Sequence, residues 1–168
     1  MSDNKDKLLQ GFNRMVDELH AAVEKAEETL SPTVSEMIDN AQKLSKQAYA
    51  LTQDEAKNIT EHLKREIRHA REYLQTDGKE LKEWFNFDVQ QVEDRFAEFL
   101  AQAADKTWLD FRQFAQETEQ HSIYKTGEIC SPGTLRCLKC GQTMKFTKST
   151  RIPPCPKCHH TQFERVVK

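Results

Sequence analysis

The chain has 168 residues, of which 37% are apolar and 31% charged, and its mean hydropathy is −0.81. This composition suits narrow helices that each bury one apolar stripe, and it includes no apolar run long enough to cross a membrane. The net charge of −2 hides an asymmetry. Residues 1–133 hold 17 basic and 26 acidic side chains, whereas residues 134–168 hold eight basic side chains and one acidic side chain.

The first residues, MSDNKDKLLQGF, contain no apolar stretch of signal-peptide length. We therefore expect a cytoplasmic protein that does not contact a membrane. In that reducing compartment, closely spaced cysteines are metal ligands more often than disulfide partners.

Apolar residues recur every three or four positions up to about residue 118, which predicts a mainly α arm over residues 1–118. Four helices are expected in this arm, at about 4–30, 32–50, 53–76 and 79–117. Only Asp77-Gly78 separates the last two helices, which predicts a long antiparallel helical hairpin with coiled-coil character.

Two helix starts have capping signals. Ser31 would cap the second helix with Pro32 in its first turn, and Thr52 with Glu55 would form a capping box for the third. The predicted core stripes are Leu8, Phe12, Met15, Val16, Leu19, Val23, Ala26 and Leu30, then Val34, Met37, Ile38, Ala41, Leu44 and Ala48, then Ala56, Ile59, Leu63, Ile67, Ala70 and Leu74.

The C-terminal part has a different composition. Gly127, Pro132 and Gly133 break helicity, so residues 119–133 are predicted to form a linker. Residues 134–168 are predicted to form a small β zinc ribbon with rubredoxin-like knuckles. Its short strands are expected at 134–137, 143–148 and 162–167.

Two cysteine pairs carry the clearest chemical signal in the chain: Cys137 with Cys140, and Cys155 with Cys158. Two residues between paired cysteines let both thiolates of a tight turn point at one ion, and a second such turn completes a tetrahedral shell of four sulfurs. The 14 residues between the pairs are one fewer than usual. We expect one structural Zn²⁺ on these four cysteines, with iron in a rubredoxin-like site as the alternative.

Three neighbouring residues need separate interpretation. Gly141 follows the first pair, where positive φ is often needed, and His159 takes the equivalent position after the second. Histidine tolerates that geometry less well, so the second turn is expected to be strained or differently shaped. His159 and His160 are alternative ligands that two intact cysteine pairs make unnecessary. Cys130 is interpreted as a free or half-buried thiol, with redox sensing as the alternative.

Further motifs surround the cysteines. They are Thr126-Gly127-Glu128, Pro132-Gly133, Leu135, Lys139, Gly141, Pro154, Pro156-Lys157 and Gln162-Phe163. Together with the cysteines, over residues 126–165, these motifs resemble the YbeL-like zinc-ribbon proteins of bacteria, a family of undetermined biochemical role. The resemblance implies that a charged helical region precedes a C-terminal ribbon, and that Cys137, Cys140, Cys155 and Cys158 bind zinc. His159 departs from it, because such ribbons more often have glycine there.

The sequence contains no Gly-rich phosphate loop, nucleophile elbow or His-Glu-x-x-His motif, and four protein sulfurs leave no metal position for a reactive water. We therefore expect no enzymatic activity and no small-molecule substrate. Amphipathic helices commonly pair with other helices. The first hypothesis is an interaction or regulatory adaptor, whose partner is an unidentified protein or a second copy of the chain.

The basic ribbon supports nucleic-acid binding as a second hypothesis. The candidate groups are Lys145, Lys148 and Arg165 for phosphates, and Phe146, Phe163 and His160 for stacking on bases. The acidic arm would repel phosphate, however, and the two phenylalanines also fit the small core of a ribbon.

Iron redox chemistry is the third hypothesis. A helical bundle followed by a rubredoxin-like module is the layout of rubrerythrins, whose di-iron centre needs two Glu-x-x-His motifs. This chain has one, from Glu66 to His69, and His69 lies off the apolar stripe. The di-iron form is therefore disfavoured.

Overall fold

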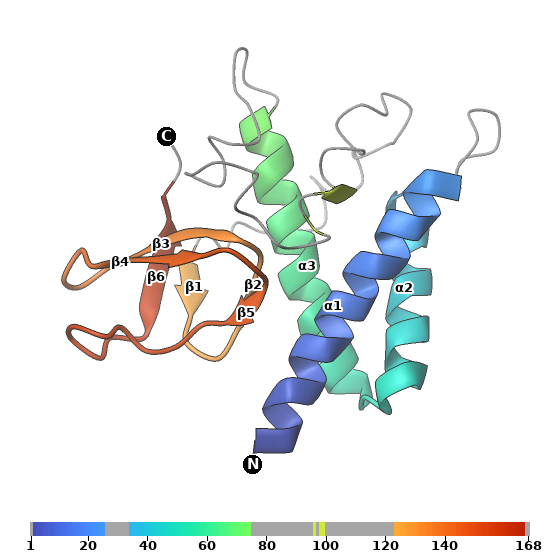
Figure 1. Ribbon diagram of the computed structural model, residues 1–168, viewed down its shortest axis with the longest axis horizontal. Helices are drawn as coiled ribbons and strands as arrows, with labels where there is room; N and C mark the ends of the chain where they lie inside the picture. The colour runs from blue at the N-terminus through green and yellow to red at the C-terminus, as the bar shows by residue number, and fades with distance from the viewer. Residues whose placement is uncertain (1, 26–33, 75–95, 97, 100–122, 167–168) are drawn as a thin grey trace.

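The computed structural model describes residues 2–25, 34–74, 96, 98–99 and 123–166. Three helices lie side by side and run alternately up, down and up: α1 (Ser2–Lys25), α2 (Val34–Tyr49) and α3 (Gln53–Leu74) (Figure 1). The predicted fourth helix at 79–117, the hairpin turn before it and the Ser31-Pro32 cap lie outside the described residues, apart from three helical positions at 96, 98 and 99. None of the described helices is both long and apolar enough to span a membrane.

One apolar core joins the three helices, and most of it comes from the predicted stripes. Residues three and four apart lie on the same face of a helix, so each stripe faces the other two helices. The completely buried side chains include Phe12, Leu19, Ile38, Leu63 and Ile67. Apolar periodicity therefore predicted most of the core that the described side chains form, while the side chains of Ala26, Leu30, Val34 and Leu74 lie outside the described residues.

Helices α1 and α2 approach closely at Gly11 and Ser45. The Ser45 hydroxyl is buried and donates a hydrogen bond of 2.7 Å to the Gly11 carbonyl oxygen. A Cβ atom at Gly11 would lie 3.0 Å from the Leu51 side chain and 3.1 Å from the Ile59 side chain, so a larger residue would require these side chains to shift. The contact also shows where the predicted stripe of α2 is wrong, because Ser45 is in the core and Ala48 is exposed.

The predicted capping box at the start of α3 is confirmed. The Glu55 N–H donates to the Thr52 hydroxyl at 3.2 Å, and the Thr52 N–H donates to the Glu55 carboxylate at 2.9 Å. Lys7 of α1 lies 3.1 Å from the same carboxylate. The Thr52 N–H, followed by Lys7, lowers the pKa of Glu55. A local capping motif thus also joins α1 to the start of α3.

The C-terminal part forms two small antiparallel sheets. The first has the order β1 (Ile123–Lys125), β6 (Gln162–Arg165), β3 (Gly133–Cys137) and β4 (Thr143–Phe146), and the second pairs β2 (Ile129–Cys130) with β5 (Thr150–Arg151). Phe163 in the inner strand β6 is paired with Tyr124 of β1 along one edge and with Cys137 of β3 along the other. These residues form a ribbon core with Leu135 and Ile152.

The predicted linker at 119–133 needs correction, because residues 123–133 belong to these sheets. β1 and β2 are only three and two residues long, too short for a recognisable pattern, and Gly127 between them, with Pro132 and Gly133 after them, suggested a break. Gly127 has a φ of +92° in the turn that leads from β1 to β2. Among the described residues, the ribbon therefore includes Ile123 and the strands that follow it, and does not start at Thr134.

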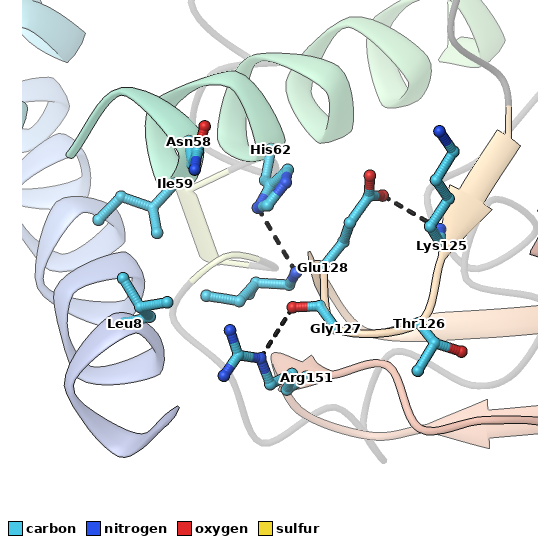
Figure 2. A pocket seen from close by; sticks show the side chains of 10 residues that line it. Leu8, Asn58, Ile59, His62, Lys125, Thr126, Gly127, Glu128 and Arg151 are labelled. Atoms are coloured by element: carbon cyan, nitrogen blue, oxygen red, sulfur yellow. Dashed lines mark hydrogen bonds between the residues drawn. The ribbon is translucent and has the colours of Figure 1, made fainter. Parts of the chain in front are cut away.

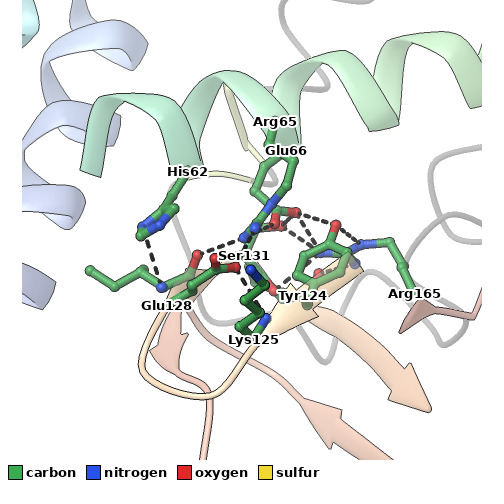
Figure 3. Close-up of polar contacts among 10 residues, drawn as sticks. His62, Arg65, Glu66, Tyr124, Lys125, Glu128, Ser131 and Arg165 are labelled. Atoms are coloured by element: carbon green, nitrogen blue, oxygen red, sulfur yellow. Dashed lines mark hydrogen bonds and ion pairs between the residues drawn. The ribbon is translucent and has the colours of Figure 1, made fainter. Parts of the chain in front are cut away.

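The ribbon packs directly against the helices, a relationship that the sequence left open. Strand β2 lies beside α3, and Ile129 is buried in the helical core instead of the ribbon core (Figure 1). At the end of the turn before β2, the Ile129 N–H lies 3.5 Å from Nδ1 of His62 in α3 (Figure 3). The helices and the ribbon consequently share a packed interface.

Candidate metal centre

The four predicted cysteines meet at the end of the ribbon. Cys137 ends β3 and Cys140 lies in the turn before β4, while Cys155 and Cys158 lie between β5 and β6. All four sulfurs lie within 4.8 Å of one another, and the pairs Cys137–Cys158 and Cys140–Cys155 are each 3.6 Å apart. A tetrahedron of metal–sulfur bonds about 2.3 Å long has edges of about 3.8 Å. The spacing therefore fits one ion bound by four sulfurs.

Equivalent hydrogen bonds shape the two knuckles. In the first knuckle, the N–H of Cys137 donates to the carbonyl oxygen of Gln142 at 2.8 Å, and the N–H of Gly141 donates to the carbonyl oxygen of Cys137 at 3.0 Å. In the second knuckle, the N–H of Cys155 donates to the carbonyl oxygen of residue 160 at 3.0 Å, and that of His159 donates to Cys155 at 2.9 Å. The two turns thus present their cysteines in the same way.

His159 adopts the same left-handed backbone conformation as Gly141, with φ values of +59° and +74°. Of the two alternatives expected for the second turn, a different shape is therefore excluded and a strained backbone is observed. The expected strain remains, because a residue with a Cβ atom pays about 1–2 kcal/mol in this region. The clustered ligand atoms in the described part of the chain are the four sulfurs, and neither His159 nor His160 contributes to them.

Backbone N–H groups in the knuckles favour thiolates. Desolvation raises the pKa of Cys155, but hydrogen bonds from the N–H groups of Cys158 and Lys157 outweigh it and lower the pKa to about 6. In the first knuckle, desolvation likewise opposes the N–H groups of Cys140 and Lys139, and the pKa of Cys137 is lowered overall. The His160 N–H favours a thiolate at Cys158 as well, but burial and the three neighbouring cysteine sulfurs outweigh it and raise the pKa of Cys158 to about 12. Cys155 and Cys137 are therefore the cysteines that most readily form thiolates, which is the form that binds soft divalent metals.

Cys130 is separate from this cluster. It is a free thiol, the first of the two expected alternatives, and its side chain is completely buried in the ribbon core. Burial, followed by the nearby carboxylate of Glu66, raises the pKa of Cys130 to about 12. A buried, protonated thiol is a poor nucleophile, which argues against redox sensing at this position.

A second polar centre lies where the ribbon meets α3, and sequence reasoning missed it (Figure 3). Glu66 of α3 and Arg165 of β6 form an ion pair of 2.5 Å, and both side chains have 0% exposure. Ser131 donates to the Glu66 carboxylate at 2.6 Å and accepts from Arg165 at 2.9 Å. Arg165 also donates to the Tyr124 hydroxyl at 3.1 Å and the Pro132 carbonyl oxygen at 2.9 Å. Strand and loop groups therefore surround the buried pair.

Arg65 extends this contact along α3. Its guanidinium donates to Glu128 at 2.5 Å and to the Ile129 carbonyl oxygen at 3.2 Å, and it lies 4.1 Å from the centre of the Tyr124 ring. Burial alone would raise the pKa of Glu66, but Arg165, followed by Arg65, lowers it overall. The carboxylate is therefore ionised at neutral pH.

Both residues of the single Glu-x-x-His motif take part in the contact between α3 and the ribbon. The carboxylate of Glu66 is occupied by Arg165 and Ser131, and His69 packs edge-on against Tyr124 with ring centres 6.4 Å apart. Among the described residues, the cysteine cluster is the one group arranged to hold a metal. Two features of the sequence could have indicated that this pair is buried. Glu66 lies on the apolar side of α3, and Arg165 faces the same side of β6 as the buried Phe163.

Residues 21–167 match the family model DUF1451, described as "Zinc-ribbon containing domain". The chain belongs to this family. The match includes all four clustered cysteines and both sides of the contact between Glu66 and Arg165. As a DUF1451 member with a four-cysteine cluster, it is a zinc-binding protein.

Curated relatives support the resemblance to YbeL-like proteins, which is confirmed. Three proteins named "Uncharacterized protein YbeL", from Escherichia coli strains K12, O6:H1 and O157:H7, are each 34% identical to the chain over 74 residues. The matched segment is 44% of this chain and 46% of each relative, so the chain spans about half the length of the relatives it matches. No solved structure matches the chain.

The groups suggested for nucleic-acid binding differ in how deeply this DUF1451 ribbon buries them. Phe163 is completely buried in the ribbon core, and Arg165 is buried in its ion pair with Glu66. Phe146 packs partly against the same core. Lys145 and Lys148 are exposed. Three of the six candidate groups therefore have structural roles.

Proposed function

We propose that the protein is a non-enzymatic adaptor in which one structural zinc ion folds the ribbon, and the ribbon and helices together present a surface to a protein partner. The buried ion pair between Glu66 and Arg165 is the observation that carries this proposal. A ribbon on a free tether would not bury a charged pair against a helix, because desolvating the charges is costly unless both partners stay in place. The pair therefore supports a fixed arrangement of the two parts.

A structural role for the metal follows from the donor set. Four cysteine sulfurs complete a tetrahedral shell, which leaves no position where a metal-bound water could react. The ribbon core is small, and modules of this size rarely fold without added stabilisation. Zinc supplies about 10–16 kcal/mol of apparent binding free energy to small zinc-folded peptides. Metal binding would thus control whether the interaction surface exists.

The first knuckle offers the most suitable contact surface. Leu138 lies between two clustered cysteines and is one of two large apolar side chains that the described residues expose, at 43%. Lys139 and Lys157 are exposed in the adjacent turns. An apolar side chain among lysines suits a partner with an acidic surface and a small apolar pocket. The acidic residues 1–133 of a second copy also have that charge, so self-association is part of the proposal.

Affinity purification of the tagged full-length protein from cells tests the adaptor role. A Leu138→Ser variant should lose the partner and keep its zinc, because Leu138 is exposed and is not a ligand. A Thr143→Ser variant, changed at another exposed ribbon position, is the matched control and should keep both. Sedimentation of purified wild-type protein over a range of concentrations separates self-association from binding to another protein. Equal recovery of all partners by the Leu138→Ser variant would exclude the knuckle as the contact surface.

Nucleic-acid binding is the second candidate, and the exposed Lys139, Lys145, Lys148 and Lys157 favour it. Binding through these lysines would depend strongly on salt, because it would release counterions from phosphates. A titration of the zinc-loaded protein into fluorescent single-stranded and double-stranded DNA and RNA measures this. Affinity that does not weaken as the salt concentration rises would count against phosphate-driven binding.

A further inference from the structure

A cavity of about 460 Å³ lies at the seam between the helices and the ribbon (Figure 2). Leu8 of α1 and Ile59 of α3 line its apolar side, and Gly127 and Arg151 line it from the ribbon. Its volume falls within the range of about 300–1,000 Å³ that is typical of small-molecule sites. The cavity is separate from the cysteine cluster and from the ion pair between α3 and β6.

Arg151 is held in a fixed orientation on the cavity wall. Its Nε donates to the Gly127 carbonyl oxygen at 2.8 Å, and Figure 2 shows the guanidinium extending toward the side that carries Leu8. In the described part of the chain, its two terminal nitrogens have no hydrogen-bond partner. An oriented guanidinium with two donors available is suited to bidentate contact with a carboxylate or phosphate.

The other lining residues leave the cavity with excess positive charge. Glu128 is the one acidic residue among those that line it, and its carboxylate is already paired with Arg65 at 2.5 Å. Burial, followed by Arg65, lowers the pKa of His62 to about 4, so this ring is neutral at neutral pH. The ring Nδ1 faces the Ile129 N–H at 3.5 Å. Lys125, an exposed lining residue whose side chain points away from Arg151, adds a second positive charge (Figure 2).

We propose that this cavity binds a small organic anion, a carboxylate or phosphate monoester with a short apolar group. The anionic end would contact Arg151, and the apolar group would lie against Leu8 and Ile59. Because the walls come from α1, α3 and the ribbon, a bound anion would stabilise the packing of the ribbon on the helices. This site does not depend on the adaptor role proposed above.

Nuclear magnetic resonance titrations of the zinc-loaded, full-length protein test the proposal. The probes are benzoate and phenyl phosphate, with neutral benzyl alcohol as the control ligand at the same concentrations. Both anions should cause saturable shifts of the Gly127 and Ile129 backbone amides and of the Arg151 side-chain Nε–H. Benzyl alcohol should cause much smaller shifts. Equal shifts from benzyl alcohol, or no saturation with either anion, would overturn the proposal.

Two arginine variants locate the anion. Arg151→Gln should weaken binding of both anions by at least about tenfold, because it removes a charge-assisted hydrogen-bonding group. Arg136→Gln, which changes an exposed arginine paired with Glu164 outside the cavity, should bind as the wild type does. Wild-type affinity in Arg151→Gln, or anion-induced shifts confined to the cysteine knuckles, would show that the anions bind elsewhere.

A conservative variant keeps the test decisive if Arg151→Gln does not fold. Arg151→Lys retains the positive charge but loses the paired terminal donors. It should bind benzoate more weakly than the wild type and still show saturable shifts at Gly127. Binding by Arg151→Lys that equals that of the wild type would contradict the proposed bidentate contact.

Discussion

Glu66 and Arg165 are 99 residues apart in the chain, yet their side chains form a 2.5 Å ion pair that solvent does not reach. Removing one partner leaves the other as a buried unpaired charge, which typically costs about 3–5 kcal/mol. We therefore expect Arg165→Met to lower the free energy of unfolding by about 3 kcal/mol or more in a denaturant titration of the zinc-loaded protein.

Arg136→Met is the matched control for that experiment. It removes an arginine from the same sheet whose partner, Glu164, is also exposed, and such pairs contribute at most about 1 kcal/mol. The double variant Glu66→Leu/Arg165→Met should be more stable than Arg165→Met alone, because it leaves no carboxylate unpaired. Equal losses for Arg165→Met and Arg136→Met would contradict the structural role of the buried pair.

His62 should make the stability of the protein depend on pH at values above those at which carboxylates titrate. Its pKa is lowered to about 4 in the folded protein from an ordinary value of 6.5. Between these values the unfolded chain binds the proton and the folded protein does not, so stability should fall as the pH decreases from 6.5 to 4. The slope for one such group is at most about 1.4 kcal/mol per pH unit.

Denaturant titrations at several pH values measure this slope. His62→Gln should flatten the curve between pH 6.5 and 4.5, whereas Glu66→Gln should not affect that interval. Glu66 has a pKa below its ordinary value of 4.5, so its contribution to stability is present above pH 4.5 and is lost as the pH falls below that value. An unchanged slope in His62→Gln would show that another group causes the acid sensitivity.

Removing the metal should unfold the ribbon. We expect Cys155→Ser/Cys158→Ser to lose zinc and the dispersed amide resonances of residues 123–166, while most far-UV helical signal remains. The helices should nevertheless melt at a lower temperature, since Ile129 and Arg165 would no longer cover α3. Elemental analysis of the wild type should give one zinc per chain and a colourless solution. Stoichiometric iron would contradict the zinc assignment.

The two knuckles allow a reciprocal test of backbone strain. His159→Gly should stabilise the zinc-loaded ribbon by up to about 1 kcal/mol, because glycine adopts positive φ without the Cβ penalty. Gly141→Ala should destabilise it by a similar amount, although its Cβ would meet no other atom within 4 Å. Thermal unfolding with excess zinc measures both effects. Destabilisation by His159→Gly would indicate a stabilising role for the imidazole.

Local features of this protein could be predicted from its sequence. The spacing of the cysteines specified the cluster, because each pair closes a turn of fixed size. The capping box at Thr52 and Glu55 depends on two residues three positions apart. The three core stripes follow the period of the helix, and the error at Ala48 arose because the close contact at Gly11 brings Ser45 into the core instead.

Features that depend on distant parts of the chain could not be predicted in this way. β1 and β2 are too short to show a pattern, and they exist because β6 and β5 pair with them. The burial of Glu66 depends on a strand almost 100 residues away. A carboxylate on a helix usually indicates exposed surface. The position of Glu66 on the apolar side of α3 is a signal of burial, but only the tertiary structure shows that Arg165 neutralises it.

The position of β1 at the edge of the sheet has a practical consequence for work on fragments. A peptide designed from the cysteine motif, beginning at Thr134, would lack the strand that pairs with β6 and the Tyr124 ring that covers Phe163. Its unprotected backbone edge would be a template for pairing with other molecules. Recombinant versions of the isolated module should therefore start upstream of Ile123, and aggregation of shorter versions would report on the truncation and not on the natural protein.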